Sequence, residues 1–399
     1  MITIFDLRAK IEEDIVEQIK KNLKGEITVR SLEDNEITAC IGCWTCWVKT
    51  PGKCCFNDVM TSFYKDYVNS EKVVLILDTE QGFINHTAKA FIDRTIPHYH
   101  PYIEIVNGEC HHQARYNKYP ELYFYFDSRN LTPEQEAVTE DYLYRTAYHF
   151  QSPAFRIHTR HEFNIKTLEH RVAKRGHVQL EAYSKLQKLV IYNGSPRLKQ
   201  SNTETILSYV KSNVNADIEV RDLKEKHMWQ EWSDAFKQEQ HVIFAIPLYV
   251  HAMPSHVMEF IEKLEASQGG LGLIVQSGFP ESSQSYYLEA VFEQIVGRLG
   301  RKYMGTAIKG GIEGLQLRPN KSQIKMISHF ADLISGIILN GVMQKESLVA
   351  LAGKPYLSQG MKFLYNVLKP TGLTNFYWNM QLKENNAFEK RFDTPYRIS

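Results

Sequence analysis

The second half of the chain alternates short apolar runs with longer amphipathic segments. The apolar runs predict buried strands at 188–193, 217–223, 241–246, 271–276 and 303–308. Apolar residues at helical spacing predict helices at 203–214, 230–238, 255–266, 286–299 and 321–339. A regular alternation of strands and helices is typical of a parallel sheet with helices on both faces, and we predict that architecture here.

The first half repeats this order with longer interruptions. Strand patterns lie at 2–5, 26–32, 72–78 and 122–126, and helical patterns lie at 11–23, 59–67, 84–94 and from 133 onward. The segments 89–94 and 258–263 are similar, and each follows the third strand of its half. We therefore predict two tandem doubly wound α/β domains at 1–183 and 184–340, followed by an aromatic-rich helical extension at 341–399. The cysteine-rich segment 40–55 then reads as an insertion into the first domain.

The turn that follows the predicted strand 188–193 has the composition of a phosphate-binding loop. Gly194 permits a tight turn with positive φ, and Arg197 offers a fork of hydrogen-bond donors. Ser, Asn and Thr side chains cap helix N-termini, where free N–H groups and the helix dipole favour an anion. The residues expected to form this site are Ser195, Pro196, Arg197, Ser201, Asn202 and Thr203. An ordinary capped strand–helix turn is the alternative.

The spacing of this loop excludes the two commonest nucleotide motifs. No Gly-Lys-Ser/Thr sequence follows the strand, and the three-glycine dinucleotide fingerprint is absent. A short Ser/Thr-rich loop after the first strand of a doubly wound sheet suits a single phosphomonoester such as that of FMN.

Two further loops should reach the same edge of the sheet, because ligands bind beyond the carboxyl ends of parallel strands. The second loop contains Pro247, Leu248, Tyr249, Val250 and His251, and the third contains Ser277, Gly278 and Phe279. Both loops combine small residues with aromatic ones, which suits contact with an isoalloxazine ring. Tyr249 and Phe279 could instead pack at the rim, and His251 could serve ligand contact or structural hydrogen bonding.

These motifs resemble the NADPH-dependent FMN reductase family, which includes the iron–sulfur flavoproteins. The resemblance is carried by Gly194-Ser-Pro-Arg197, the Ser-Asn-Thr sequence that begins at Ser201, and Pro247-Leu-Tyr249, and it covers most of 188–310. It implies flavodoxin-like domains, FMN held by the three loops, and a homo-oligomer.

The first half is similar to this family in its cysteine segment and in 89–94, but it departs at the first turn. Residues 6–10 lack glycine and the Ser/Thr cradle, and Asp6 would repel a phosphate. The loop 78–82 carries two more carboxylates. We therefore predict FMN in the second domain and none in the first.

Five of the six cysteines lie between residues 40 and 55. The compact spacing of Cys40, Cys43, Cys46 and Cys54 would allow four thiolates to hold one 4Fe–4S cluster, as in the iron–sulfur flavoproteins. Zinc and free or redox-active thiols are the alternatives. The sequence Cys110-His111-His112 is a weaker metal candidate, for which hydrogen-bonded structure is the alternative.

Charge and hydropathy restrict the partners and the location. The net charge of +1 gives no reason to expect a nucleic acid or a membrane as partner. The chain has no apolar run of membrane length, and residues 1–25 do not resemble a signal peptide, so we expect a cytoplasmic protein.

The function expected from these observations is that of an FMN-dependent NAD(P)H oxidoreductase. It would pass electrons from reduced flavin to a quinone, an aromatic compound or a flavin. We predict no catalytic side chain, because the cofactor carries the redox chemistry. The alternatives are an FMN and iron–sulfur electron-transfer protein, and a non-catalytic flavodoxin-like protein.

Overall fold

The computed structural model describes residues 1–9, 13–32, 36–159, 163–175, 188–197, 201–315 and 320–398. The chain divides into two compact units. One unit combines Met1–Val172 with Ser358–Ser399, and the other comprises Ala173–Leu357. The predicted domain boundary at 183 lies outside the described residues.

In the second unit, the described residues form a five-stranded sheet in the order β10-β9-β11-β12-β13, and all neighbouring strands are parallel. The strands are β9 (Lys188–Asn193), β10 (Asp217–Asp222), β11 (His241–Pro247), β12 (Gly270–Gln276) and β13 (Lys302–Lys309). This is the 2-1-3-4-5 order of flavodoxin-like doubly wound sheets. The prediction of an α/β chain with parallel sheets is confirmed.

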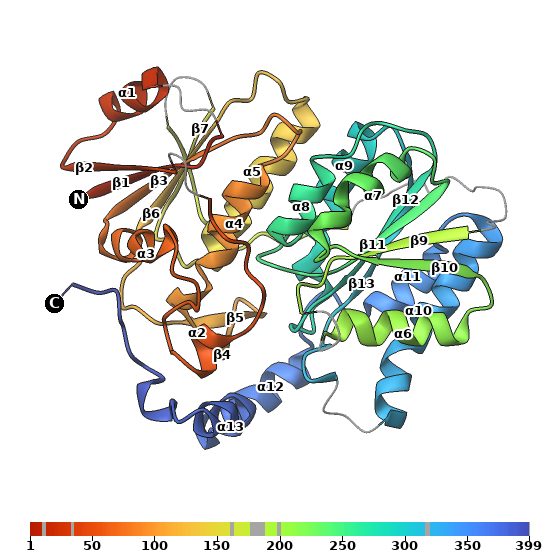
Figure 1. Ribbon diagram of the computed structural model, residues 1–399. Helices are drawn as coiled ribbons and strands as arrows, with labels where there is room; N and C mark the ends of the chain where they lie inside the picture. The colour runs from red at the N-terminus through yellow and green to blue at the C-terminus, as the bar shows by residue number, and fades with distance from the viewer. Residues whose placement is uncertain are drawn as a thin grey trace. The chain divides into compact units, whose positions relative to one another are not determined.

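Helices cover both faces of this sheet (Figure 1). They are α6 (Asn202–Asn213), α7 (Trp229–Phe236), α8 (Ser255–Ile261), α9 (Tyr286–Arg298), α10 (Asn320–Asn340) and α11 (Lys345–Ala352). The helices α6, α10 and α11 share one apolar core with the sheet, whereas α7, α8 and α9 pack aromatic residues on the other face. The helix α8 ends five residues before the predicted position 266.

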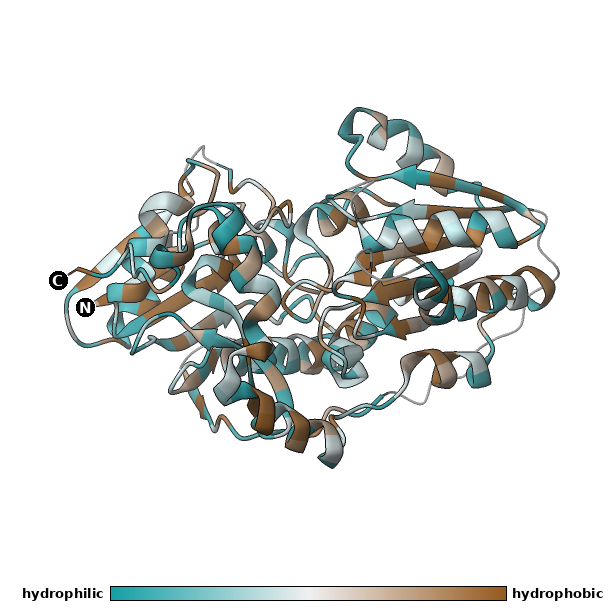
Figure 2. Cartoon of the chain, turned by 90° about the horizontal axis from the view of Figure 1, so that it is seen from below, coloured by the Kyte–Doolittle hydropathy of each residue, from teal (hydrophilic) through white to brown (hydrophobic). Residues whose placement is uncertain are grey.

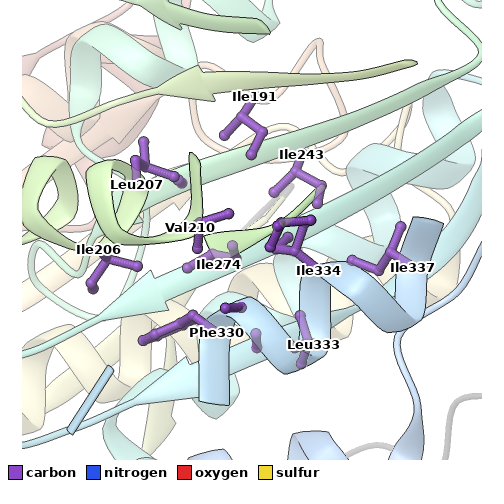
Figure 3. Close-up of a cluster of buried hydrophobic side chains, with 14 of the residues drawn as sticks. Ile191, Ile206, Leu207, Val210, Ile243, Ile274, Phe330, Leu333, Ile334 and Ile337 are labelled. Atoms are coloured by element: carbon purple, nitrogen blue, oxygen red, sulfur yellow. The ribbon is translucent and has the colours of Figure 1, made fainter. Parts of the chain in front are cut away.

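The core between α6, α10 and the sheet is made of large aliphatic side chains and Phe330 (Figure 3). Ile191 and Ile243 point into this core, and their neighbours Tyr192 and Phe244 stack on the opposite face with ring centroids 5.2 Å apart. Successive residues of a strand point to opposite faces, so continuous apolar runs are what a doubly covered sheet requires. The helices carry hydrophilic residues beside their hydrophobic ones (Figure 2).

In the first unit, the described residues form a six-stranded sheet in the order β2-β1-β3-β6-β7-β8. Its strands are β1 (Ile2–Asp6), β2 (Ile27–Ser31), β3 (Lys72–Leu77), β6 (Glu121–Phe126), β7 (Phe155–His158) and β8 (Asn164–Lys166). The first five strands are parallel and repeat the 2-1-3-4-5 order, while β8 runs antiparallel to β7. The shared order agrees with the predicted duplication, although common descent of the two halves stays a prediction.

The helices of the first unit also lie on both faces of its sheet. They are α1 (Glu13–Lys21), α3 (Met60–Asn69), α4 (His86–Arg94) and α5 (Pro133–His149), and the short α2 (Thr45–Val48) lies in the cysteine segment. Ile4 packs with residues of α1, and Phe5 packs with α3 and α4 through rings 5.0 Å away on each helix. The strands β4 (Tyr99–Val106) and β5 (Glu109–Ala114) form an antiparallel hairpin that the sequence did not predict.

The C-terminal segment contributes to both units. Residues 341–357, with α11, belong to the second unit, whereas α12 (Gln359–Leu368) and α13 (Phe376–Glu384) belong to the first. Trp378 of α13 packs edge-on against Trp44 and Trp47, with centroid distances of 5.2 and 5.3 Å. The tail therefore packs on the cysteine segment, more than 300 residues earlier in the chain.

Among the described residues, none of the helices has the length and apolar character needed to cross a membrane.

Replacing Phe330 by Ala should lower the free energy of unfolding by about 3–5 kcal/mol, because the fully buried ring would leave a cavity. Ile324 on the same helix is 39% exposed, and Ile324→Ala should cost less than about 1 kcal/mol. Urea unfolding followed by circular dichroism would measure both values. Equal losses would contradict the packing of α10 described here.

Candidate functional site

The loops after β9, β11, β12 and β13 are joined by backbone hydrogen bonds. Gly194 N–H donates to Ala245 O over 2.9 Å, Leu248 N–H donates to Gln276 O over 2.8 Å, and Ser277 N–H donates to Lys309 O over 3.0 Å. The three predicted loops therefore lie side by side at the carboxyl edge of the sheet. A fourth loop, 310–315, joins them and was not predicted.

The first loop leads from β9 into α6 through a capped helix N-terminus. The Ser201 hydroxyl accepts the Glu204 N–H over 3.0 Å, which makes Ser201 the N-cap as predicted. Ser201 and Thr203 are buried, and Asn202 and Arg197 are partly exposed. Residues 198–200 of this loop lie outside the described residues.

Side chains of the first loop already accept two of its backbone N–H groups. The Ser195 N–H donates to Asn193 Oδ1 over 3.1 Å, and the Arg197 N–H donates to Ser195 Oγ over 3.4 Å. A phosphate would have to replace these acceptors to use the same N–H groups. The loop is therefore ordered by its own polar side chains, at some cost to anion affinity.

Gly194 has a different role from the predicted one. It does not adopt the positive φ that would favour glycine. A Cβ at this position would instead lie 2.6 Å from Val257 Cγ2 and 2.7 Å from Ile246 Cγ2. Glycine is required here because the loop passes close to α8 and β11.

The second loop contains a strained turn. Tyr249 and Ala252 exchange two backbone hydrogen bonds of 3.0 Å, and the residues between them, Val250 and His251, have φ values of 40° and 59°. Positive φ at both central residues is the pattern of a type I′ turn, which Asn and Gly usually occupy. A β-branched valine in this region costs on the order of 1–3 kcal/mol.

His251 has a structural hydrogen bond. Its ring is buried, and Nδ1 lies 3.1 Å from the carbonyl oxygen of Gln284, to which it donates. His251 was expected to serve either ligand contact or structural hydrogen bonding. The bond to Gln284 is of the structural kind, and a role in ligand contact stays a prediction. Leu248 and Tyr249 are partly exposed, and Pro247 is buried at the end of β11.

The third and fourth loops hold each other and the start of α6. The Gly311 N–H donates to Phe279 O over 2.9 Å, and the Ile312 N–H donates to Ser277 O over 3.1 Å. The Asn202 side chain donates from Nδ2 to Ile312 O over 2.9 Å. Asn202 therefore connects the first loop to the fourth, while Gly278 and Phe279 stay at least partly exposed.

Glu313 of the fourth loop introduces a carboxyl group that the sequence did not predict at this site. A Cβ at Gly278 would collide with the Glu313 carboxylate, so the two loops are in close contact there. Burial raises the pKa of Glu313 to about 7, and the positive charge of Arg197 opposes this rise. No local sequence pattern predicts an acid close to Arg197, because only the fold brings Glu313 to it.

The corresponding edge of the first unit has different chemistry. Arg8 donates to Asp6 through Nε and Nη2, over 2.9 and 2.7 Å, and both side chains are buried. Asp6 therefore occupies the guanidinium group of Arg8, which could otherwise bind an anion. In the next loop, the Glu80 N–H donates to Asp78 Oδ1 over 3.0 Å. The absence of FMN from this unit stays a prediction.

The cysteine segment brings two of its thiols into contact, and its described residues form no recognisable metal site. Cys43 and Cys55 are exposed with sulfur atoms 3.6 Å apart, whereas Cys46 is buried and Cys40 and Cys54 are partly buried. Among the described residues, no group of three or more His, Cys, Asp and Glu side chains is arranged to hold a metal ion. The predicted 4Fe–4S cluster therefore gains no support from the geometry.

The segment Cys110-His111-His112 lies on β5 within a buried polar cluster. The Glu109 carboxylate lies 2.7 Å from Arg145 Nη2 and 3.9 Å from His111 Nε2. Burial lowers the pKa of His111 to about 3. These contacts agree with the structural alternative for this trio.

Comparisons with known proteins give weak similarities. No protein-family model and no curated protein sequence matches the chain. An NADPH-quinone reductase from P. pentosaceus is 15% identical with a TM-score of 0.29, and the match covers 37% of this chain and 96% of that one. An FMN-dependent NADH-azoreductase from Bacillus anthracis, in complex with FMN, is 15% identical with a TM-score of 0.29, covering 37% and 99%.

The Trp repressor binding protein from Bacillus subtilis is 18% identical with a TM-score of 0.29, and the match covers 36% of this chain and 99% of that one. At these TM-scores the fold assignment depends on the strand order described above.

Mild oxidation with a small disulfide should join Cys43 to Cys55 before any other pair, because these two sulfur atoms are exposed and 3.6 Å apart. Peptide mapping by mass spectrometry would identify the bond. Cys55→Ser should abolish it, and Cys46→Ser should leave it unchanged. Faster pairing of Cys40 with Cys54 would contradict this arrangement.

Proposed function

We propose that the protein is an FMN-dependent NAD(P)H oxidoreductase whose flavin binds at the carboxyl edge of the second sheet. The observation that supports this most strongly is the position of the first two loops. They follow β9 and β11, the neighbouring strands between which the chain order reverses. In doubly wound sheets of this order, that crevice is where FMN binds.

The residues present suit a phosphomonoester at the start of α6. Ser201 caps the helix, and the first turn of a helix offers unpaired N–H groups and a favourable dipole. Arg197 adds a cationic donor to the same loop, and Ser195, Pro196, Asn202 and Thr203 complete its wall. Several such contacts of about 0.3–1 kcal/mol each would converge on one phosphate.

The second and third loops would hold the ring system. Residues Pro247, Leu248, Tyr249, Val250 and His251 would border one side, and Ser277, Gly278 and Phe279 the other. The bound flavin would supply hydride acceptance from NAD(P)H and electron transfer to the acceptor. The protein would orient the ring through backbone groups of the rigid turn at Val250 and exclude water with Tyr249 and Phe279. The family resemblance makes a quinone, an aromatic compound or a flavin the expected acceptor.

A second candidate is a flavodoxin-like protein that binds no flavin. Two observations favour it: the Glu313 carboxyl group lies close enough to interact with Arg197, and Asn193 already accepts the Ser195 N–H. A titration of the purified protein with FMN separates the two candidates. Saturable quenching of flavin fluorescence supports the oxidoreductase, and no uptake supports the second candidate.

Replacing Arg197 by Ala should weaken FMN binding about 10–100-fold, because a charge-assisted hydrogen bond contributes roughly 1.5–3 kcal/mol. Lys211 is exposed near the other end of α6, and Lys211→Ala should leave the affinity unchanged. Flavin fluorescence gives both dissociation constants. Equal affinity of the Arg197 variant and the native protein would place the phosphate elsewhere.

The affinity for FMN should fall as the pH rises through about 7, because the raised pKa of Glu313 then lets a second anion form beside the phosphate. A neutral Glu313 at lower pH would remove that repulsion. Below about pH 6, protonation of the phosphate itself should weaken binding again.

The matched variant is Glu313→Gln, which keeps the shape of the side chain and removes its charge. Its affinity should stay level between about pH 6.5 and pH 8.5, where the native protein loses affinity. Parallel pH profiles of the two proteins would show that Glu313 does not titrate beside the bound phosphate.

A further inference from the structure

The helix α12 and the two turns that follow it expose large apolar side chains. Among the described residues, six of the fifteen exposed large hydrophobic side chains lie within positions 361–376. Their exposed fractions are 46% for Met361, 72% for Phe363, 56% for Leu364, 53% for Val367, 59% for Leu373 and 65% for Phe376. Such a concentration of exposed apolar side chains on one short segment marks an interaction surface.

The orientation of α12 is the reverse of that of an ordinary surface helix. Tyr365 holds it to the first unit by donating a hydrogen bond to the Ile103 carbonyl, and Lys362 reaches over Gly108. At about 3.6 residues per turn, Phe363 and Val367 lie on the side away from these two contacts. A surface helix normally buries its apolar stripe, but every residue of α12 is at least partly exposed.

The charged residues of this segment are all positive. Residues 358–383 contain three lysines, at 362, 369 and 383, and no Asp or Glu, and Glu104 of β4 lies close enough to interact with Lys369. The whole chain has a net charge of only +1, so the positive charge is a local feature. A second copy of the same segment would bring like charges together in a symmetric contact. An anionic partner is complementary to it.

We propose that the segment 359–376 docks on the surface of an anionic lipid bilayer. Helices that lie in a membrane interface combine bulky apolar residues with lysines and bind through both apolar burial and attraction to anionic lipids. Phe363, Leu364 and Val367 would enter the headgroup region, and the exposed Lys369 and Lys383 would contact lipid phosphates.

This proposal is independent of the flavin site. The expectation of no membrane partner followed from the net charge of the whole chain, whereas the docking surface depends on the local distribution of lysines and apolar residues. The segment would lie on the bilayer and would not cross it.

Vesicle sedimentation tests the proposal with the full chain. The protein should pellet with phosphatidylcholine vesicles containing about 30% phosphatidylglycerol and bind at least about tenfold more weakly to pure phosphatidylcholine. Raising NaCl from about 0.1 to about 0.5 M should weaken the binding, because salt screens the lysines.

The test variant replaces Phe363, Leu364 and Val367 by Ser, and it should lose at least about tenfold in vesicle affinity. These side chains are exposed, so its thermal unfolding should match that of the native protein. The matched control is Val349→Ser on α11, which is 59% exposed and lies outside the segment. This control should bind vesicles as the native protein does.

Three results would overturn the proposal. The first is no binding of the native protein to anionic vesicles, and the second is equal binding by the triple variant. The third is concentration-dependent dimerisation that the triple variant abolishes, without any vesicle binding, since the surface would then be an interface between two copies of the chain.

Discussion

The parallel hydrogen-bond ladder of the second sheet continues beyond the strand ends, and the candidate site depends on this continuation. Pro247 pairs with Gln276 and Gln276 with Lys309, so β11, β12 and β13 end at the same level, while Asn193 pairs with Ala245 and β9 ends two residues earlier. The next backbone bonds then fix the first residues of each loop. Because these bonds involve no side chains, the register of the strands fixes the positions of the loops. The side chains of the loops then decide what they can bind.

Much of this arrangement could be predicted from the sequence, because strands covered on both faces require continuous apolar runs such as that of β9. The order of strands and helices then placed the three loops at one edge. The hairpin β4–β5 could not be predicted, because Pro101 and several histidines interrupt its strand pattern. The turn at Val250 and His251 was also unpredictable, since local preferences disfavour those residues there and tertiary bonds enforce the conformation. Glu313 lies more than 100 residues from Arg197, and only the fold brings them together.

The two units share a strand order but differ in the chemistry of the first turn, which is why fold alone does not define function. In the second unit, Arg197 is partly exposed, lies four residues before the N-cap of α6 in the sequence, and interacts with the Glu313 carboxyl group. In the first unit, the Asp6 carboxylate accepts two bonds from the guanidinium group of Arg8 inside the protein. A bidentate carboxylate occupies an arginine much as a phosphate would. Removing Asp6 would leave Arg8 buried without its partner, so a single substitution would destabilise this turn before it created an anion site.

The contacts of the C-terminal tail, residues 376–398, explain how the cysteine segment is held in place and why one face of α12 is exposed. Trp378 packs against Trp44 and Trp47, and Arg115 donates to the backbone oxygens of Arg391 and Asp393 over 3.0 and 2.9 Å. An apolar cluster of this size can stabilise a short irregular segment, a role that metals or disulfides fill in many small loops. The same contacts anchor the part of the chain that follows α12. The hydrogen bond from Tyr365 to Ile103 sets the rotation of α12 about its own axis. With both constraints in place, Phe363 and Val367 cannot turn inward, so the apolar exposure of α12 is a consequence of how the tail is anchored.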